Sequence, residues 1–212
     1  MGLPSNHTLI AFMLFFPVMV FLASAYAKPE DKDRWDSKYG NEKYVYGKDP
    51  VVFLRSNVEL LPKGKALDIA MGEGRNGVFL ATRGFDVLGL DISEVGLRKA
   101  QKLADEKGVK IQTRVTDLES IALEKNTYDV VLCMYYLQHD LFPQIKEALK
   151  SGGMAVIETY NTDYLKYNPR FFHKYALQTN ELLEIFKDFK IIRYQSYDDG
   201  KEAYSSIIAR KP

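Results

Sequence analysis

The chain has 212 residues, 46% of them hydrophobic, which is enough to bury one substantial core of ordinary domain size. Its 29 basic and 28 acidic residues give a formal net charge of +1 without long runs of one sign, so a nucleic-acid partner is not expected. The single cysteine, Cys133, excludes an intrachain disulfide, and the three histidines are too scattered along the sequence to predict a metal site.

The first residues differ from the rest of the chain. From Leu9 to Ala27 there is no charged residue, and Ala25-Tyr26-Ala27 has the small-x-small pattern of a signal-peptidase site. The same run, roughly 19 residues, is long enough to span a bilayer, and the basic residues just after it would then hold the domain on the cytoplasmic side. We expect residues 1–27 to be either a signal peptide cleaved near Ala27, with the domain exported, or an uncleaved membrane anchor.

Residues 28–61 are predicted to form a linker and an aromatic helical lid. The charged stretch from Lys28 to about Asp33 is interpreted as the linker. A short helix and a loop are expected to follow, with the aromatic residues Trp35, Tyr39, Tyr44, Tyr46 and Phe53. These rings either pack against the outside of the core or, in the functional alternative, close over a bound cofactor.

Beyond Pro62, strand and helix patterns alternate as in a sheet with right-handed crossovers. The predicted strands cover 66–70, 85–90, 109–115, 128–133, 154–159, 189–197 and 203–209, and the predicted helices cover 75–83, 94–107, 141–150 and 180–187. Asp198-Asp199-Gly200 joins the last two strands as a hairpin, so one edge of the sheet should be antiparallel. We therefore predict a single α/β domain over residues 62–212, with a Rossmann-like, doubly wound and mostly parallel sheet.

A glycine-rich turn follows the first of these strands. Gly72, Gly74 and Gly77 have the spacing of a dinucleotide fingerprint, and Asp91 ends the next strand. The turn also carries Asp68 before it and Glu73 inside it, and two carboxylates repel a diphosphate. A cofactor that is cationic beside the loop fits better, and S-adenosylmethionine, with its sulfonium and amino groups, is the common one.

Five segments in order resemble class I S-adenosylmethionine-dependent methyltransferases, and most of all the small-molecule branch that includes the tellurite-resistance methyltransferases. They are residues 67–76, 89–93, 116–118, 128–131 and 149–153. The Tyr44-Val45-Tyr46-Gly47 stretch and the predicted helix over 181–186 also match that branch. One departure is Ala70, which stands where a glycine is usual, and its methyl group is expected to narrow the space beside the methionine part of the cofactor.

The resemblance implies roles at the start of the cofactor site. Gly72 and Gly74 would let the backbone approach the cofactor closely. Asp68 would order the loop and face the cofactor's amino group, and Arg75 would pair with its carboxylate or, equally, lie on the surface of its helix. Further cofactor-binding positions implied by the resemblance are Ala70, Ile92 and Tyr46.

The resemblance also assigns the ribose and adenine contacts. Asp91 would accept hydrogen bonds from both ribose hydroxyls, or else cap the next helix. Asp117 would accept from the adenine amino group, unless it lies in a simple solvated loop, and Leu118 would offer its backbone N–H to the ring.

Methyl transfer is predicted to occur where the fourth strand ends, by in-line displacement at carbon, so alignment and exclusion of water are the main requirements. Tyr135 and Tyr136 are expected to line the acceptor pocket. If the acceptor carries a proton, His139 is the best general base, the alternative being a helix-capping or surface histidine. The acceptor is expected to be a small thiol, carboxylate or chalcogen oxyanion, selected in part by residues 160–178.

Two other functions remain open. The glycine spacing and Asp91 allow an NAD-dependent oxidoreductase, although the acidic turn and the closing hairpin disfavour it. Ala70 and the apolar N-terminal run allow a non-catalytic relative that binds the cofactor at the membrane.

Overall fold

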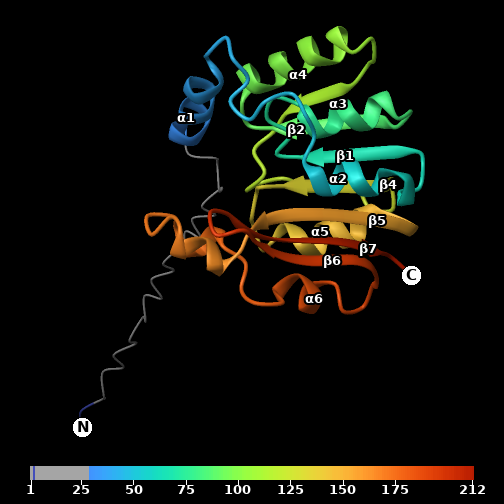
Figure 1. Cartoon of the computed structure of the whole chain (residues 1–212). Coiled ribbons are helices and arrows are strands. Elements are labelled where there is room, and N and C mark those ends of the chain that lie inside the picture. Colours follow the sequence, from blue (N-terminus) through green and yellow to red (C-terminus); the bar gives the residue numbers. More distant parts are fainter. Residues whose placement is uncertain (1, 3–28) are drawn as a thin grey trace.

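The computed structural model describes Gly2 and residues 29–212, and a seven-stranded sheet organises the described part (Figure 1). The strands are β1 (Lys65–Ile69), β2 (Asp86–Asp91), β3 (Gln112–Val115), β4 (Tyr128–Met134), β5 (Leu149–Tyr160), β6 (Lys190–Asp198) and β7 (Ala203–Arg210). Their order is β3-β2-β1-β4-β5-β7-β6, with β1 to β5 parallel and β7 antiparallel to both of its neighbours. The predicted α/β sheet with one antiparallel edge is confirmed.

Helices cover both faces of this sheet. They are α1 (Pro29–Tyr39), α2 (Val52–Asn57), α3 (Arg75–Thr82), α4 (Glu94–Glu106), α5 (Leu141–Ala148) and α6 (Glu181–Ile185), with the shorter turns η1 (Val58–Leu60), η2 (Thr162–Lys166) and η3 (His173–Tyr175). Side chains of α2, α3 and α4 share one hydrophobic cluster, and those of α5 and α6 share another. The central strands contribute to both, since Val130 and Leu132 of β4 lie in the first cluster while Val131 and Cys133 lie in the second.

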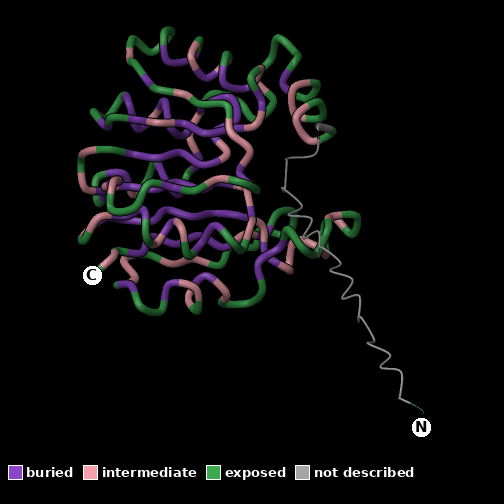
Figure 2. The backbone as a smooth tube through the Cα atoms, turned by 180° about the vertical axis from the view of Figure 1, so that it is seen from behind, coloured by how far each residue is buried: buried purple, intermediate pink, exposed green. Residues whose placement is uncertain are grey.

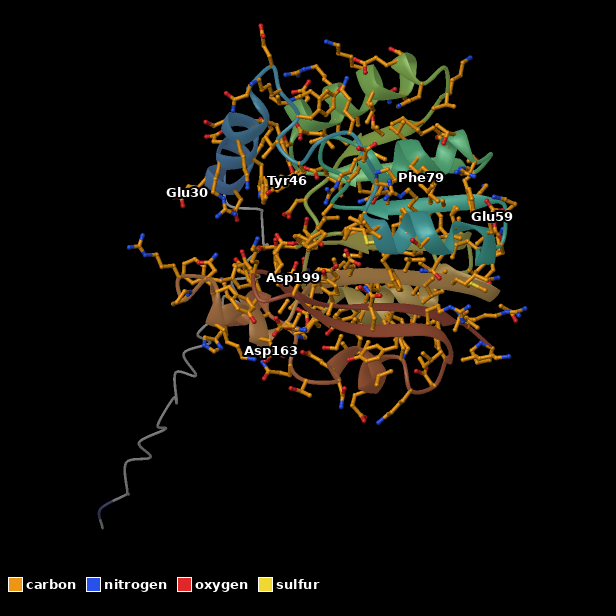
Figure 3. All side chains as sticks on the ribbon, viewed as in Figure 1. Glu30, Tyr46, Glu59, Phe79, Asp163 and Asp199 are labelled. Carbon is orange, nitrogen blue, oxygen red and sulfur yellow. The ribbon has the colours of Figure 1, made fainter. Side chains whose placement is uncertain are left out.

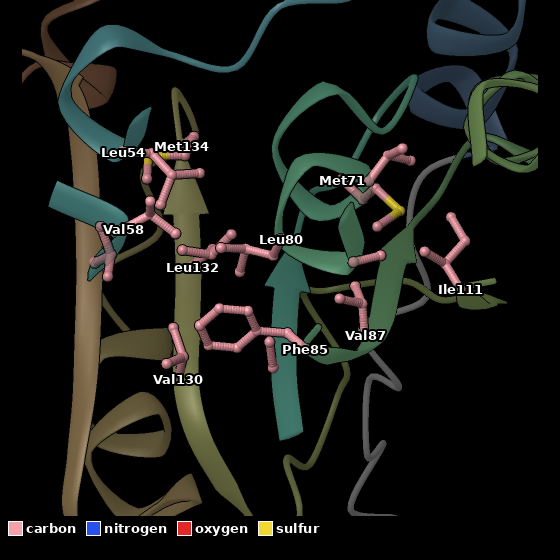
Figure 4. Packing of buried hydrophobic residues seen from close by; sticks show 14 of the residues in the cluster. Leu54, Val58, Met71, Leu80, Phe85, Val87, Ile111, Val130, Leu132 and Met134 are labelled. Atoms are coloured by element: carbon pink, nitrogen blue, oxygen red, sulfur yellow. The ribbon is translucent and has the colours of Figure 1, made fainter. Parts of the chain in front are cut away.

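The strands β1, β2, β4, β5 and β7 are therefore largely buried, as Figure 2 shows in purple, whereas the edge strands β3 and β6 contain only intermediate and exposed residues. Figure 4 shows the first cluster, where Leu80 and Phe85 pack between the side chains of β4 and β2. Each fully buried Leu or Ile side chain contributes about 1.5–3 kcal/mol to the stability of the folded state. This two-sided core therefore holds the strand ends in fixed positions.

The predicted helix boundaries are largely confirmed. The Ser93 side chain accepts a hydrogen bond from the Gly96 amide (3.0 Å) and caps α4. Gly84 follows α3 with φ +84°, the left-handed conformation typical of a residue that ends a helix.

The predicted linker over residues 28–33 is wrong from Pro29 onward, because α1 begins there. Proline suits the first helical position, and Glu30 and Asp31 in the first turn favour the positive end of the helix dipole. An ion pair between Lys32 and Asp36, one helical turn apart, adds to this. The helix α2 was not predicted, because its six residues are too few to show a periodic pattern.

The predicted signal peptide or anchor, residues 1–27, lies outside the described residues apart from Gly2. Among the residues that the structure describes, no helix is both long enough and apolar enough to cross a bilayer.

The parallel strands β1 to β5 end at one edge of the sheet, on the left in Figure 1. Helix α1 and the segment 160–178 lie at this same edge (Figure 1). Because β7 is antiparallel to β5, its first residues also reach this edge, with Tyr204 opposite Tyr160 and Ser206 opposite Glu158. Residues from separate parts of the chain are thus brought together where the sequence predicts a site.

Candidate active site

The glycine turn after β1 has left-handed backbone conformations, with φ +56° at Gly72 and +88° at Gly74. A Cβ on Gly74 would lie 2.6 Å from the Cβ of Ala100 in α4, and one on Gly72 would lie 2.8 Å from the Tyr39 hydroxyl oxygen. The two glycines thus serve the turn conformation and its packing against α4 and α1, and the close cofactor approach expected of them stays a prediction.

Ala70 also has a left-handed conformation, with φ +56°. The usual glycine at this position is therefore explained by backbone geometry, because a residue with a Cβ is strained there by about 1 kcal/mol or more. The sequence alone pointed to the methyl group and missed this strain.

Asp68 lies at the end of β1 and is 2% exposed. Its carboxylate accepts a hydrogen bond from the Gly77 amide, while Oδ2 has no hydrogen-bond partner. Burial raises the pKa of Asp68 to about 7, the Asp91 charge adds to this, and Arg75 opposes it. An unpaired carboxylate oxygen of this kind is the atom that an ammonium group would satisfy.

Asp91 ends β2 and is also buried. Its Oδ2 accepts from the Gly72 amide (2.7 Å), its Oδ1 accepts from the Ser93 amide (2.8 Å), and the Ile92 amide donates to it as well. Burial raises the pKa of Asp91. The helix-capping alternative is wrong, because Ser93 caps α4, and Asp91 instead ties the turn after β1 to the loop after β2.

The loop after β3 carries the residues predicted to bind adenine. Asp117 is half-buried and accepts from the Glu119 amide (2.9 Å), so its carboxylate takes part in a local turn. The Leu118 carbonyl accepts from Gln138 Nε2 (3.2 Å), and the Tyr136 hydroxyl donates to Gln138 Oε1 (2.7 Å). Tyr136 is therefore linked, through Gln138, to the loop that carries Leu118.

Glu73 is turned toward the N-terminal segment (residues 29–51). Its Oε2 accepts from the Val45 amide (2.7 Å) and its Oε1 lies 2.5 Å from Lys99 Nζ. Since Lys99 compensates its charge, Glu73 does not present a free carboxylate to the turn. Of the two carboxylates predicted to make this turn negative, Asp68 and Glu73, the second is therefore paired with a cation.

Lys99 also holds the N-terminal segment in place. Its ammonium group donates to the carbonyls of Tyr39 (3.3 Å), Asn41 (2.8 Å) and Lys43 (2.9 Å). Asp36 of α1 accepts from Ser93 Oγ (2.6 Å), so α1 is fixed to the start of α4. The aromatic segment thus lies over the glycine turn.

Tyr46 and Arg75 meet beside this segment. Arg75 Nη1 donates to the Tyr46 carbonyl (3.0 Å), and its guanidinium lies 5.8 Å from the ring centres of both Tyr46 and Tyr135. Tyr46 is 47% exposed and lies between α1 and the sheet edge in Figure 3. Arg75 therefore lies between the N-terminal segment and the end of β4.

Tyr135 follows β4 with φ +57°, and its amide donates to the Glu158 carbonyl (2.6 Å). The Glu158 carboxylate, 2% exposed, accepts from Ser206 Oγ (2.7 Å) and from the Tyr135 side chain. Burial raises the pKa of Glu158. Sequence reasoning missed Glu158, although a glutamate directly after the apolar Val156-Ile157 run was a usable signal.

His139 lies elsewhere. It is exposed, its Nε2 lies 2.7 Å from Glu181 Oε1 of α6, and its ring packs edge-on against Phe142. Among the described residues, the contacts of His139 and of Tyr135 have no residue in common. The structure brings Tyr135, but not His139, together with Arg75.

The residues at this edge fit a cofactor such as S-adenosylmethionine. Asp68 lies near the end of β1, Asp91 ends β2 and Asp117 comes two residues after β3. These three strands are adjacent, and the buried Oδ2 of Asp68 lacks a partner. The roles of the individual residues toward the cofactor stay predictions.

The chain matches a known protein family over most of its length. The family model described as "Tellurite resistance protein TehB" matches residues 31–202. A ubiquinone biosynthesis O-methyltransferase of Rickettsia conorii is 29% identical over 168 residues, 68% of this chain and 58% of the relative. A probable S-adenosyl-L-methionine-dependent methyltransferase TehB of Haemophilus influenzae is 27% identical over 205 residues, 88% of this chain and 68% of the relative. The chain thus spans little more than half to two thirds of these relatives.

Solved structures show the same fold. The crystal structure of TehB from Haemophilus influenzae has a TM-score of 0.65 at 20% identity, covering 85% of this chain and 67% of that one. A geranyl diphosphate C-methyltransferase from Streptomyces coelicolor, in complex with Mg²⁺, geranyl diphosphate and S-adenosyl-L-homocysteine, has a TM-score of 0.68 at 17% identity, covering 88% and 100%. The described domain therefore has the class I methyltransferase fold.

Proposed function

Because this chain belongs to the TehB family, we propose that it is an S-adenosylmethionine-dependent methyltransferase that acts on a small-molecule acceptor. The observation that carries the proposal is the buried, unpaired Asp68 carboxylate oxygen beside a glycine turn, at the edge where β1 to β5 end. The methyltransferase names of the relatives support it.

The cofactor supplies a methyl group already activated on a sulfonium. In our proposal, Asp68 faces its amino group, Asp91 its ribose, and the Asp117–Leu118 loop its adenine. Ala70, Gly72, Gly74 and Ile92 form the backbone around it, and Arg75 and Tyr46 lie at its carboxylate end. The protein's main task is then to align the acceptor and exclude water, which Tyr135 and the N-terminal segment serve.

Calorimetric titration of the full chain tests this proposal against the two alternatives. We expect S-adenosylmethionine and S-adenosylhomocysteine to bind and NADH not to bind. Binding of NADH alone would favour the oxidoreductase, and binding of S-adenosylmethionine without transfer to any acceptor would favour the non-catalytic relative. Labelled cofactor, offered with thiols, phenols, small carboxylates, tellurite and selenite, then reports the transfer itself.

We further propose that the domain faces the cytoplasm, anchored or associated at the membrane through residues 1–27, since S-adenosylmethionine is made in the cytosol. Cleavage near Ala27 with export is the alternative. N-terminal sequencing of the native protein distinguishes them, because a start at Lys28 would contradict an uncleaved anchor.

A further inference from the structure

Glu158 is a buried acid that has no role in the cofactor binding proposed above. No ion-pair partner of its carboxylate is found among residues 29–212, and the two donors to it are the hydroxyl groups of Ser206 and Tyr135. Arg75 and Glu202 are the charged groups that act on it, with opposite effects on its pKa, and burial raises that pKa overall. A buried carboxylate without a counter-ion is costly to fold, so its position at the acceptor end of the site points to a use.

Tyr135 is held in a strained conformation by this same glutamate. A left-handed φ strains a non-glycine residue and persists only where the surroundings enforce it. Here the Tyr135 amide donates to the Glu158 carbonyl and the Tyr135 side chain hydrogen bonds to the Glu158 carboxylate. The strain thus fixes one phenol hydroxyl against one carboxylate.

Two further tyrosines flank this pair. The rings of Tyr160 and Tyr204 lie 5.1 Å and 6.3 Å from the Tyr135 ring, centre to centre, and all three tyrosines are only half-buried. We call Tyr135, Tyr160 and Tyr204 the tyrosine cluster. The Arg75 guanidinium above Tyr135 joins this cluster to the start of α3, directly after the glycine turn. A flat aromatic molecule matches such a surface, because rings prefer stacked and edge-on contacts with one another.

We propose, on the premise of the methyltransferase function above, that Tyr135 and Glu158 form a proton relay for an aromatic acceptor with a neutral hydroxyl group, a phenol. A phenol keeps its proton at neutral pH, with a reference pKa near 10, and needs a proton acceptor to become a good nucleophile. Tellurite, selenite and carboxylates need no such proton acceptor, because they already present anionic oxygens or lone pairs. The charge of the Glu158 carboxylate also disfavours their binding.

Methyl transfer to the phenol couples the loss of its hydroxyl proton to bond formation at the methyl carbon. The acceptor's O–H bond breaks while its oxygen bonds to the methyl carbon, and the electron pair of the methyl–sulfur bond stays on sulfur. The proton passes to Tyr135 Oη, which gives its own proton to the Glu158 carboxylate. The resulting glutamic acid returns the proton to solvent after the product leaves.

The test uses the full chain with labelled S-adenosylmethionine and catechol as the probe, beside tellurite and selenite. Tyr135→Phe and Glu158→Gln each remove one part of the relay while keeping the shape of the side chain. Tyr197→Phe is the matched control, because Tyr197 stacks on Tyr204 but its hydroxyl bonds to Asp199, away from Glu158. A circular dichroism spectrum of each variant checks its fold.

We expect wild type and Tyr197→Phe to methylate catechol, and both relay variants to lose about 100-fold in kcat while keeping their affinity for the cofactor. The wild-type rate should fall at acid pH as Glu158 becomes protonated, and Glu158→Gln should lose this fall. A second readout needs no cofactor: catechol should bind the cofactor-free chain, more weakly after Glu158→Gln and unchanged after Tyr197→Phe.

Two results would overturn the relay while leaving the methyltransferase function intact. One is methylation of tellurite or selenite but not of catechol, and the other is wild-type kcat and pH dependence in Glu158→Gln. Failure of the chain to bind S-adenosylmethionine would instead remove the proposed function, and the relay with it.

Discussion

Asp68 is the residue at which binding and stability oppose each other most directly. Its carboxylate is buried with one oxygen unpaired, and burial raises its pKa to about 7 from an ordinary value near 4. The folded state therefore keeps a proton that the unfolded state has lost between about pH 4 and pH 7. This proton stabilises the folded state relative to the unfolded state at low pH. The contribution is lost as the pH rises through the pKa of Asp68 in the folded state.

Asp68→Asn should consequently gain stability relative to wild type as the pH rises from 4 to 8. We expect an advantage of about 1–2 kcal/mol at pH 8, since the amide also leaves donors unpaired, and no advantage at pH 4. Urea denaturation of both proteins at the two pH values measures this difference. The variant should also bind S-adenosylmethionine at least tenfold more weakly, and a pH-independent stability difference would contradict the pKa assigned to Asp68.

Ala70 offers a second test at the residue scale, because its φ of +56° strains any residue with a Cβ. Ala70→Gly should stabilise the protein by about 0.5 kcal/mol, the relief of strain exceeding the entropy that glycine adds to the unfolded chain. Ala81→Gly within α3 is the matched control, and it should destabilise by about 1 kcal/mol because its position is helical and buried. Equal losses in both variants would show that the left-handed conformation of Ala70 is unstrained.

At the scale of elements, α1 and the loop after it depend on one side chain from α4. Lys99 pairs with Glu73 and donates to three carbonyls of the N-terminal segment, while being only 14% exposed. Breaking a buried pair of this kind leaves a glutamate charge without compensation, which costs about 3–5 kcal/mol. The segment over the glycine turn is therefore held mainly by polar contacts with a helix distant in sequence.

Lys99→Met should release the N-terminal segment while leaving the sheet folded. We expect faster proteolysis within residues 40–50 and a cofactor affinity reduced about tenfold, since the segment no longer covers the turn. Lys102→Met, three residues further along α4 and exposed, is the control and should behave as wild type. Equal protection of the loop in both variants would argue against the role given to Lys99.

The topology of the whole sheet determines which residues of the site could be predicted from the sequence. Asp68, Asp91 and Asp117 were found because each lies within two residues of the end of a strand in the sequential β1-β2-β3 part, where local patterns fix the geometry. Glu158 was not found as part of the site because its partner Ser206 comes from β7, through the antiparallel register of β5 and β7.

Contacts between separate parts of the chain also explain why the sequence did not predict the pairing of Glu73 or the separation of Tyr135 from Tyr136. The contact of Lys99 with Glu73 joins a helix to a turn and could not be seen in either alone. Neighbouring Tyr135 and Tyr136 were expected in one pocket, yet they turn to opposite sides, toward Glu158 and toward Gln138. The left-handed conformation of Tyr135, which sends it there, has no signal in the sequence.

The sharing of β1, β4 and β5 between both hydrophobic clusters predicts that the described domain unfolds as one unit. Trp35 is the only tryptophan and lies in α1, so its fluorescence reports the N-terminal segment, whereas far-ultraviolet circular dichroism reports the whole domain. In urea the two transitions of the wild type should coincide, because Asp36 and Lys99 join α1 to α4. S-adenosylhomocysteine at 100 times its Kd should move both together by about 2.7 kcal/mol. A fluorescence transition that precedes the other in wild type, and that the ligand does not shift, would mean that the N-terminal segment is no part of the cofactor site.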